Sequence, residues 1–433
     1  MFRFALLALF CFSAVYSIKI AVIPVTLGII LWPICAILLF WRRPAQFIPQ
    51  VTKGGVSLPF IWISALFVYS VCISILRGGG QDFSVPYNFS VWALLFVPSA
   101  FLLVAAVQEG AGGGLWRGMD IQDLLVIVIL SQSVFIYWSF VSVEFRGVSS
   151  SILGDLSEGT LDIGGSRVKG FSNGGGALLS LTQAIGAALS VKLFIERDRW
   201  RYVFFAAVVA GSTLLTARTG LMFIALFLAM YLPYCIISRR IRWRIFLFVI
   251  AIGGLLSFYL YNNFVEDNYK ILFEEYVLTR SFDIFVSMFS GEVGENSAVQ
   301  AIANMYVVPD TFAGLIFGSG LFTVGGIGYV GDPGYIKYIN YFGLLGCLGM
   351  YGYFLLIMLM TVRHSASYPE KVFICIVYFL FFVVETKEPF FAKANIILHL
   401  LYFYTIHSAA IRRRKTVGVS TEIPEVALAG QGG

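Results

Sequence analysis

Long apolar stretches follow one another along nearly the whole of this 433-residue chain, and that pattern leaves few folds open. A helix needs about 20 apolar residues to cross the hydrocarbon core of a bilayer. Hydrophobic residues make up 59% of the chain and charged residues 12%, whereas a soluble domain has about half apolar and about a quarter charged residues. The sequence therefore predicts an all-α polytopic membrane protein with about 12 transmembrane helices.

The expected spans fill the chain from one terminus to the other, without an internal repeat, so we expect one transmembrane domain over 1–433. The first span has the length of a signal peptide, but its basic start is weak and a second apolar run follows at once, so we interpret it as a retained helix. The spans are 2–17, 20–41, 58–76, 88–107, 121–142, 174–195, 200–217, 218–237, 243–261, 335–361, 371–386 and 391–410.

Charge along the loops predicts the orientation of these helices. Four basic residues at 412–415 follow the last span directly, and cytoplasmic segments of membrane proteins carry an excess of Lys and Arg. Placing the tail, 411–433, in the cytoplasm fixes the side of every other loop and makes both termini cytoplasmic. Cytoplasmic segments then hold 19 of the 30 Lys and Arg residues, whereas 16 of the 24 Asp and Glu residues lie outside. The net charge of +6 therefore reports orientation, and no nucleic acid is expected as a partner.

Two long polar segments interrupt the apolar pattern, and the same parity places both on the outer face, where we expect the chemistry. They form an outer loop at 143–173 and a larger one at 262–334. Apolar residues stand among charged ones at 266–290, which suits a helix lying in the membrane interface, and 296–308 is a second short helical candidate. Glycine recurs at 317–334, so this stretch is expected to turn tightly and to bring its backbone close to a neighbour.

The positions of cysteine and histidine exclude several kinds of site. All six cysteines fall inside apolar spans, without the paired spacing of a metal site or a disulfide, so we expect them to be small core residues. His364 falls in a cytoplasmic loop, and His399 and His407 fall in the last span. Outer-face chemistry is therefore expected to use a carboxylate as its base. No metal or nucleotide motif stands in a suitable context, so no cofactor is expected.

Three basic residues are expected at one depth, at the outer boundary of the membrane. Arg167 and Lys169 stand just before the sixth span, and Arg218 lies in the very short outer turn between the seventh and eighth spans. An arginine at a helix centre in the membrane costs about 2.5–3.5 kcal/mol, and less near an end, so each needs an anionic partner. An ordinary headgroup or a loop carboxylate such as Asp162 suffices for any one alone. The three together favour a lipid phosphate, since guanidinium groups bind phosphate oxygens in a bidentate fork.

An acidic candidate stands at the start of the tenth span. Asp332 precedes Pro333, which is typical of a helix N-cap, and an Asp at the membrane surface among hydroxyl-bearing substrates could equally serve as a general base. Lys337, about one turn later, is expected to point toward the same region. A further charged group at the end of the eleventh span is expected to be a solvated cluster. Its members are Glu385, Lys387 and Glu388.

Three short elements, taken in order, resemble the Wzy-type polymerases of the O-antigen polymerase and O-antigen ligase superfamily. The stretch 167–173 resembles the family's Arg-x-x-Gly-Phe element before a helix, and 216–220 resembles its short outer Ser/Thr-x-Arg turn. The stretch 318–346 resembles its succession of Gly-x-Gly, Asp-x-Gly-Tyr-Ile and Gly-Leu-Leu-Gly motifs. Order, spacing and a common outer location strengthen the resemblance, which covers about 161–351 and leaves out the terminal helices.

The resemblance implies a GT-C-like glycosyltransferase bundle in the bacterial inner membrane, with its active site and both outer loops in the periplasm. The implied activity is that of an inverting, metal-independent polysaccharide polymerase, for O-antigen of lipopolysaccharide or for an exopolysaccharide. It transfers a growing glycan from undecaprenyl diphosphate to a lipid-linked repeat unit. The implied partners are the undecaprenyl diphosphate-linked oligosaccharide donor and acceptor, membrane lipids, a chain-length regulator and a flippase.

The resemblance also implies roles for particular residues. Arg167, Lys169 and Arg218 are expected to clamp the donor diphosphate, because this good leaving group needs charge stabilisation more than a proton donor. Asp332 is expected to take the proton from the attacking hydroxyl. A second set is expected to hold the second lipid or the glycan, with the alternative for its tyrosines that they anchor the helix at the interface. It consists of Arg77, Arg280, Tyr335, Lys337 and Tyr338.

Other functions stay open on the sequence alone. The O-antigen ligase branch uses a histidine in the large outer loop, where this chain offers Asp332. A lipid-linked oligosaccharide transporter or flippase also fits the number of helices. Transporters usually have paired repeats, broken helices and ionisable groups near mid-membrane, whereas here the charges cluster at outer boundaries. A purely structural role in an assembly leaves the clustered arginines unexplained.

Overall fold

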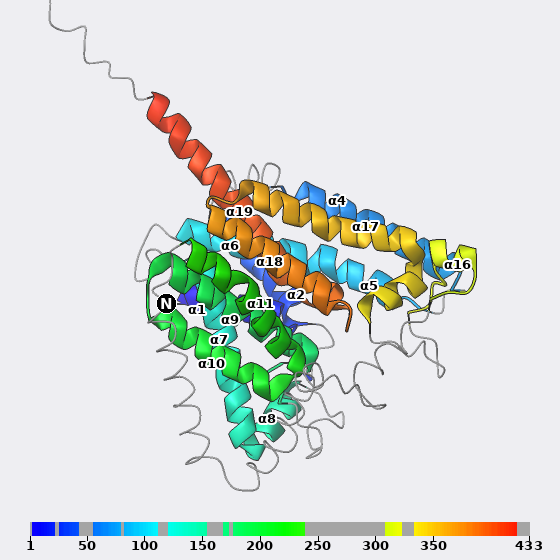
Figure 1. Cartoon of the computed structure of the whole chain (residues 1–433), viewed down its shortest axis with the longest axis horizontal. Coiled ribbons are helices and arrows are strands. Elements are labelled where there is room, and N and C mark those ends of the chain that lie inside the picture. The colour runs from blue at the N-terminus through cyan, green and yellow to red at the C-terminus, as the bar shows by residue number, and fades with distance from the viewer. Residues whose placement is uncertain are drawn as a thin grey trace, which may run out of the picture.

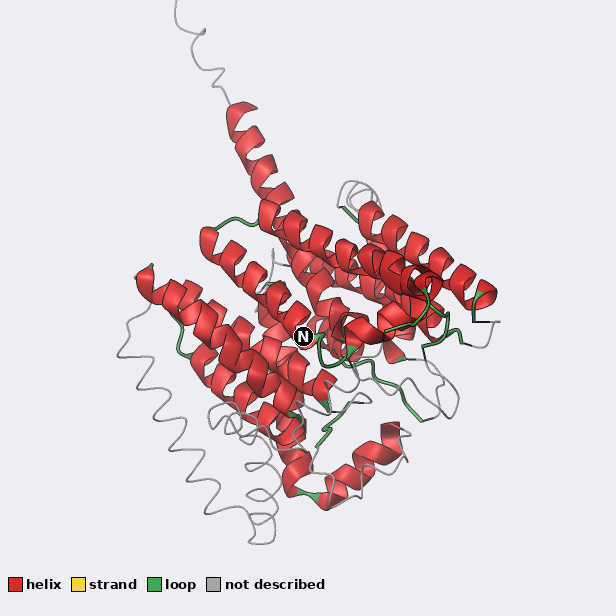
Figure 2. Ribbon diagram, turned by 45° about the vertical axis from the view of Figure 1, so that its right-hand side comes forward, coloured by secondary structure: helices red, strands yellow, loops and turns green. Residues whose placement is uncertain are grey.

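The computed structural model describes residues 2–21, 26–42, 55–78, 82–110, 120–153, 168–172, 176–238, 308–322 and 333–421. These residues form a bundle of helices (Figures 1 and 2). Their β-structure is limited to an isolated bridge between Lys19 and Thr26. The predicted all-α class is confirmed for this part of the chain.

The helices follow one another with short connections. The first are α1 (Phe2–Val15), α2 (Leu27–Arg42), α4 (Ser57–Leu76) and α5 (Ser84–Val91), and a π-helical turn, Trp92–Phe96, joins α5 to α6 (Val97–Gly110). The middle ones are α7 (Ile121–Val141), α8 (Val143–Leu153), α9 (Ala177–Arg197), α10 (Arg201–Thr216) and α11 (Arg218–Ile237). The last are α16 (Phe312–Phe317), α17 (Gly334–His364), α18 (Tyr368–Val384) and α19 (Phe390–Thr421).

Each expected span coincides with a helix, except 243–261, which lies outside the described residues. Six helices in the described part are long and apolar enough to cross a membrane, namely Ser57–Leu76, Ser84–Val107, Ile121–Val141, Ala177–Arg197, Thr219–Ile237 and Gly334–His364. Shorter apolar helices lie at Ala5–Val15, Leu27–Ile37 and Arg201–Thr216. The chain therefore has the helices of a polytopic membrane protein, while twelve crossings and their direction stay a prediction.

Two segments expected to be loop or tail contain helix. The first outer loop, 143–173, begins with α8, whose Phe145 ring stacks on Trp138 with centroids 4.5 Å apart. α19 continues to Thr421, and its last turns project beyond the bundle (Figure 1). The interfacial helices expected at 266–290 and 296–308 lie outside the described residues.

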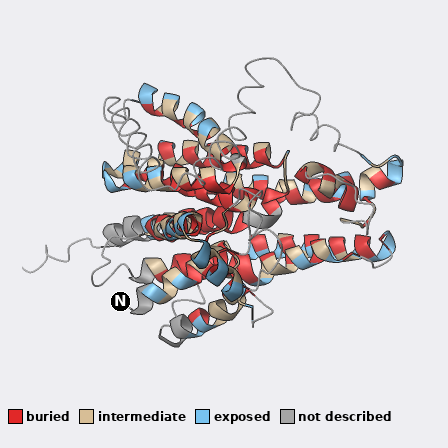
Figure 3. Cartoon of the chain, turned by 90° about the horizontal axis from the view of Figure 1, so that it is seen from below, coloured by how far each residue is buried: buried red, intermediate tan, exposed pale blue. Residues whose placement is uncertain are grey.

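α9 lies at the centre of the bundle, packed by α7, α10 and α11. Figure 3 shows buried residues concentrated in the inner helices. Small residues at 184–188 let its neighbours approach closely, as is common where membrane helices pack. A Cβ on Gly186 would lie 2.5 Å from Cγ2 of Ile129 on α7, so no larger residue fits there without displacing α7.

A buried polar network crosses this centre. The side-chain oxygen of Gln183 accepts hydrogen bonds from Ser133 (2.8 Å) and Ser212 (3.3 Å), and its amide donates to the hydroxyl of Tyr16 (3.1 Å). Because polar groups in an apolar interior are costly unless paired, these contacts fix the register of α7, α9 and α10.

The cysteines only partly fit the core role expected of them. Cys11, Cys35, Cys235 and Cys347 are buried, but Cys72 and Cys375 are exposed on helix surfaces. Apolar composition gave the spans correctly, but it does not distinguish the helix face that packs inward from the face that contacts lipid.

α17 is broken rather than continuous, which the expected span 335–361 did not foresee. Phe342 and Gly343 leave helical geometry, with a φ of 65° at Gly343. The freed carbonyls of Asn340 and Tyr341 accept hydrogen bonds from the backbone N–H groups of Ser319 (2.7 Å) and Gly320 (2.8 Å). The glycine-rich segment thus fills the break, and the prediction that its backbone approaches a neighbour closely is confirmed for 318–320; residues 323–332 lie outside the described part.

The described helix connections gather at two ends of the bundle. At one end, the backbone N–H of Gly334 at the start of α17 donates to the carbonyl of Glu385 (2.9 Å). At the other, Arg197 at the end of α9 pairs with Asp123 at the start of α7 (2.8 Å). We call these the Glu385 end and the Asp123 end. The connections alternate between them along the chain, which is compatible with the expected parity; which end faces the cytoplasm rests on the charge argument alone.

Candidate functional site

The segment that follows Arg167 packs beside the end of α10. The backbone N–H of Val168 donates to the carbonyl of Leu215 (3.0 Å), and Gln132 donates to the carbonyl of Lys169 (2.9 Å). Lys169 is half-buried. Arg167 lies outside the described residues, but its neighbour is fixed against the turn that contains Arg218.

The turn at 216–220 is fixed tightly to α9 by one serine. The Ser180 hydroxyl donates to the carbonyl of Ala217 (2.5 Å) and accepts from the backbone N–H of Gly220 (2.9 Å). A Cβ on Gly220 would lie 2.2 Å from that hydroxyl oxygen, so the turn needs glycine here. Ala217 is extended, which separates α10 from α11 and makes Arg218 the first residue of α11.

The turn between α18 and α19 reaches the same place. Lys387 donates from Nζ to Oγ1 of Thr219 (2.8 Å). Thr219 is buried and directly follows Arg218. Three separate parts of the chain, carrying Lys169, Arg218 and Lys387, therefore meet at the Glu385 end.

Glu385 is not solvated as expected; it is fully buried. Its carboxylate accepts hydrogen bonds from the backbone N–H of Phe391 (3.0 Å) and from the Tyr351 hydroxyl (3.2 Å). A Cβ on Gly334 would lie 2.4 Å from Oε1 of Glu385, so the carboxylate rests against the start of α17. This contact fixes the backbone two residues after Asp332, which itself lies outside the described residues together with Arg280.

The two tyrosines at the start of α17 are held by protein contacts. The Tyr335 hydroxyl donates to the carbonyl of Phe382 (2.7 Å), and its ring lies 4.9 Å from that of Tyr351. Tyr338 is 1% exposed, among the rings of Phe322 and Phe342. Stacking on a sugar and anchoring at an interface both require an exposed ring, so neither expected role suits Tyr338 in this arrangement.

Lys337 and Arg77 lie on the other side of this region. Nζ of Lys337 is 6.0 Å from the centre of the Phe322 ring, which is within the range of a cation–π contact. Arg77 is exposed at the end of α4, and the next residue, Gly78, touches Gly320 backbone to backbone. The structure thus connects these two cations to the start of α17 through the 318–322 segment.

Asp82 is a positioning residue that the sequence reasoning missed. Its carboxylate accepts from the backbone N–H and the hydroxyl of Ser84 (2.9 and 2.6 Å) and from the backbone N–H of Phe322 (2.8 Å). The spacing of Asp82 and Ser84 is a local signal for a turn before a helix. The contact with Phe322, 240 residues away, has no signal in the sequence.

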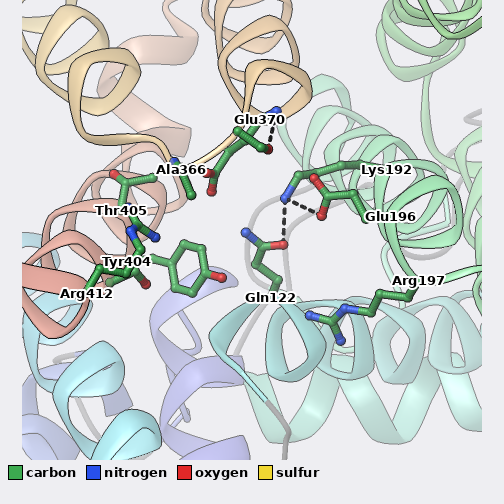
Figure 4. A pocket seen from close by; sticks show the side chains of 11 residues that line it. Gln122, Lys192, Glu196, Arg197, Ala366, Glu370, Tyr404, Thr405 and Arg412 are labelled. Atoms are coloured by element: carbon green, nitrogen blue, oxygen red, sulfur yellow. Dashed lines mark hydrogen bonds and ion pairs between the residues drawn. The ribbon is translucent and has the colours of Figure 1, made fainter. Parts of the chain in front are cut away.

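A cavity of about 240 Å³ lies at the opposite, Asp123 end (Figure 4). Lys192 is 2% exposed there and donates to Oε1 of Gln122 (2.9 Å) and pairs with Glu196 (3.2 Å). Glu370 and Tyr404 line the same space. Because each buried charge needs a partner, these contacts explain how the lysine is accommodated. None of the residues proposed to act on a substrate lines this cavity.

An ionic network beside the cavity joins the starts of α7 and α10 to the end of α9. Arg197 binds Asp120 (2.6 Å) and Asp123 (2.8 Å), and Tyr202 donates to Asp123. Asp120 also caps α7 by accepting from the backbone N–H of Gln122 (2.9 Å). These charges neutralise one another, so the Asp123 end has a structural explanation that needs no ligand.

Among the described residues, no group of three or more His, Cys, Asp or Glu side chains could hold a metal ion. The residues that meet at the Glu385 end are basic, with a buried carboxylate behind them. Such an arrangement can bind a multiply charged anion at the level where the helices end.

Comparisons of the whole chain with protein-family models and with curated proteins found no match.

Proposed function

We propose that this protein is a membrane glycosyltransferase of the polysaccharide polymerase kind. It transfers a growing O-antigen-like glycan or exopolysaccharide from undecaprenyl diphosphate to a lipid-linked repeat unit. The reaction takes place on the periplasmic face of the bacterial inner membrane. A chain-length regulator and a flippase are its proposed partners.

The observation that carries this proposal is the meeting of three distant elements at one end of the bundle. Lys169, Arg218 and the start of α17 are separated along the chain, yet hydrogen bonds at Val168 and Lys387 connect the first two elements to the helix ends around them. These are the same three elements that resemble the polymerase family. Cations at the ends of apolar helices suit a substrate whose tail lies in the membrane and whose diphosphate lies at its surface.

The proposed mechanism is a displacement at the anomeric carbon of the donor sugar. The hydroxyl of the acceptor forms the new glycosidic bond while the bond from that carbon to the diphosphate oxygen breaks, and Asp332 accepts the hydroxyl proton. Arg167, Lys169 and Arg218 stabilise the negative charge that develops on the departing diphosphate. Attack from the opposite side inverts the configuration, and no metal ion is needed where side chains supply the charge.

The test is the profile of lipid-linked glycans in a deletion strain that carries variants of this protein. Arg218→Ala and Arg167→Ala should abolish long polymer, because the leaving group loses its stabilising charge, while single lipid-linked units persist. Asp332→Asn should do nearly the same if Asp332 is the base. Normal chain lengths with Asp332→Asn would reduce Asp332 to a helix cap, and normal chain lengths with Arg218→Ala would contradict the proposed site.

The same profile separates the alternatives. Accumulation of single repeat units indicates a polymerase, full-length polymer left on the prenyl carrier indicates an O-antigen ligase, and units trapped on the inner leaflet indicate a flippase. One feature of the fold favours testing the flippase, because α17 is broken at Phe342 and Gly343 and transporters often contain broken helices. The break is filled by the 318–320 backbone rather than lining a cavity, so we rank the transporter below the polymerase.

A further inference from the structure

The turn between α18 and α19 contacts both halves of the proposed site. On one side, Lys387 donates to the hydroxyl of Thr219, the residue after Arg218 (2.8 Å). On the other side, Glu385 binds the backbone N–H of Gly334 through its own carbonyl (2.9 Å), close to the segment of Asp332. The turn therefore helps to set the separation between the proposed diphosphate clamp and the proposed base.

Lys387 is placed where its charge is difficult to explain by packing. Its side chain is half-buried and extends to Thr219, which is 1% exposed. Holding an ammonium group beside the backbone of an arginine-bearing turn concentrates positive charge, and like charges repel strongly where water is limited. An anion bound between them turns that repulsion into attraction.

A simpler explanation is that Lys387 stabilises the end of α18. A cation near a helix C-terminus interacts favourably with the exposed carbonyl groups. Here, backbone N–H groups already bind those carbonyls: Thr386 N–H donates to Val383 (3.2 Å) and Lys387 N–H donates to Val384 (2.9 Å). The Lys387 side chain instead crosses to α11, so helix capping does not account for its position.

We propose that Lys387 is a further substrate-binding residue, which completes with Arg167, Lys169 and Arg218 a four-cation site for the diphosphate of the lipid-linked donor. This inference rests on the proposed function of the same site. In the absence of substrate, Thr219 holds the ammonium group in place. On binding, the ammonium group exchanges the neutral hydroxyl for a phosphate oxygen, with which it forms a stronger, charge-assisted hydrogen bond.

The experiment measures binding of undecaprenyl diphosphate to the full-length protein in nanodiscs. Lys387→Met removes the charge and should weaken binding about tenfold or more, the loss expected for a charge-assisted hydrogen bond. Lys387→Arg keeps the charge and should retain most of the affinity. Lys371→Met, on α18 at the Asp123 end, is the matched control and should bind like the wild type.

Thr219→Val distinguishes substrate binding from a structural tie. Both Thr219→Val and Lys387→Met break the same hydrogen bond, so a purely structural role predicts equal losses of thermal stability and of binding. The proposal predicts similar thermal stability for the two variants but a much larger loss of binding for Lys387→Met. Equal binding losses overturn it.

Two further arms identify the ligand and separate this inference from the proposed function. Inorganic pyrophosphate and phosphatidylglycerol should bind more weakly than undecaprenyl diphosphate and should discriminate less between the wild type and Lys387→Met; equal discrimination would indicate a general anion site and overturn the inference. If Arg218→Ala weakens binding of undecaprenyl diphosphate and Lys387→Met does not, this inference alone fails. If neither variant weakens it, the proposed function fails as well.

Discussion

Single side chains at the Glu385 end join elements that are distant in sequence. Ser180 is the clearest case, because its one hydroxyl satisfies both Ala217 and Gly220 and so shapes the turn that carries Arg218. Glu385 does the same for the starts of α17 and α19. In each case a buried polar group is fully used, which is how a polar residue is tolerated in an apolar interior.

Ser180→Ala should destabilise the protein and reduce polymer length. The substitution leaves the carbonyl of Ala217 and the backbone N–H of Gly220 without this partner, and a buried polar group that loses its partner costs about 1–3 kcal/mol. Thermal unfolding of the purified protein measures the stability, and gel analysis of the glycan measures the activity.

Ser190→Ala is the matched control for Ser180→Ala. Ser190 lies on the same helix and is equally buried, but its hydroxyl donates within the helix, to the carbonyl of Gly186 (2.8 Å). Its replacement should cost less than about 1 kcal/mol and leave the polymer unchanged. Equal effects of the two substitutions would contradict the role given to Ser180.

The charged group 385–388 marks the limit of prediction at this scale. The sequence shows three ionisable residues within four positions, which is usually a solvated cluster. The burial of Glu385 depends on Tyr351 and on the absence of a side chain at Gly334, both remote in sequence. Hydropathy carries no information about such partners, so the burial of Glu385 could not be predicted from the sequence.

At the scale of whole elements, α17 is a helix in two parts held together by a loop. Gly343 has a φ of 65°, and a Cβ there would lie 2.2 Å from the carbonyl oxygen of Ile316. The Tyr69 hydroxyl also donates to the carbonyl of Phe342 (3.1 Å), which satisfies a group freed by the break. The positions of the helices follow from apolar runs, but the break depends on the segment 316–320.

Gly343→Ala should disrupt this joint. An L-residue with left-handed backbone geometry costs about 1–2 kcal/mol, and the close approach to Ile316 adds to that cost, so we expect a loss of about 2 kcal/mol or more. Thermal unfolding of the purified protein measures it.

Gly352→Ala in the same helix is the control, because a Cβ there meets nothing within 4 Å. Alanine is the better helix former by about 0.5–1 kcal/mol, so this variant should be as stable as the wild type or more stable. A Gly343→Ala protein that matched Gly352→Ala in stability would contradict the strained joint.

For the whole molecule, the sequence predicts more of the architecture than of the site. Composition gives the class, and apolar runs give the helices with errors of a few residues at most boundaries. Motif order anticipated that Lys169 and the turn of Arg218 come together. The contacts that bring them together involve Ser180, Lys387 and Gln132, which belong to no motif and become apparent only when the helices pack.

The central claim is that the Glu385 end, with the cations and the segment of Asp332, faces the outside of the cell. Labelling of single cysteines in intact cells with a membrane-impermeant maleimide tests this claim. The chain carries Cys72→Ala and Cys375→Ala, since these two thiols are exposed in the described part. Thr386→Cys then probes the Glu385 end, and Ala366→Cys probes the Asp123 end; both positions are exposed.

The account predicts that Thr386→Cys reacts in cells whose outer membrane is permeabilised, and that Ala366→Cys reacts only after the inner membrane is opened as well. Reaction of Ala366→Cys from outside, with Thr386→Cys protected, would place the proposed site in the cytoplasm and contradict the account.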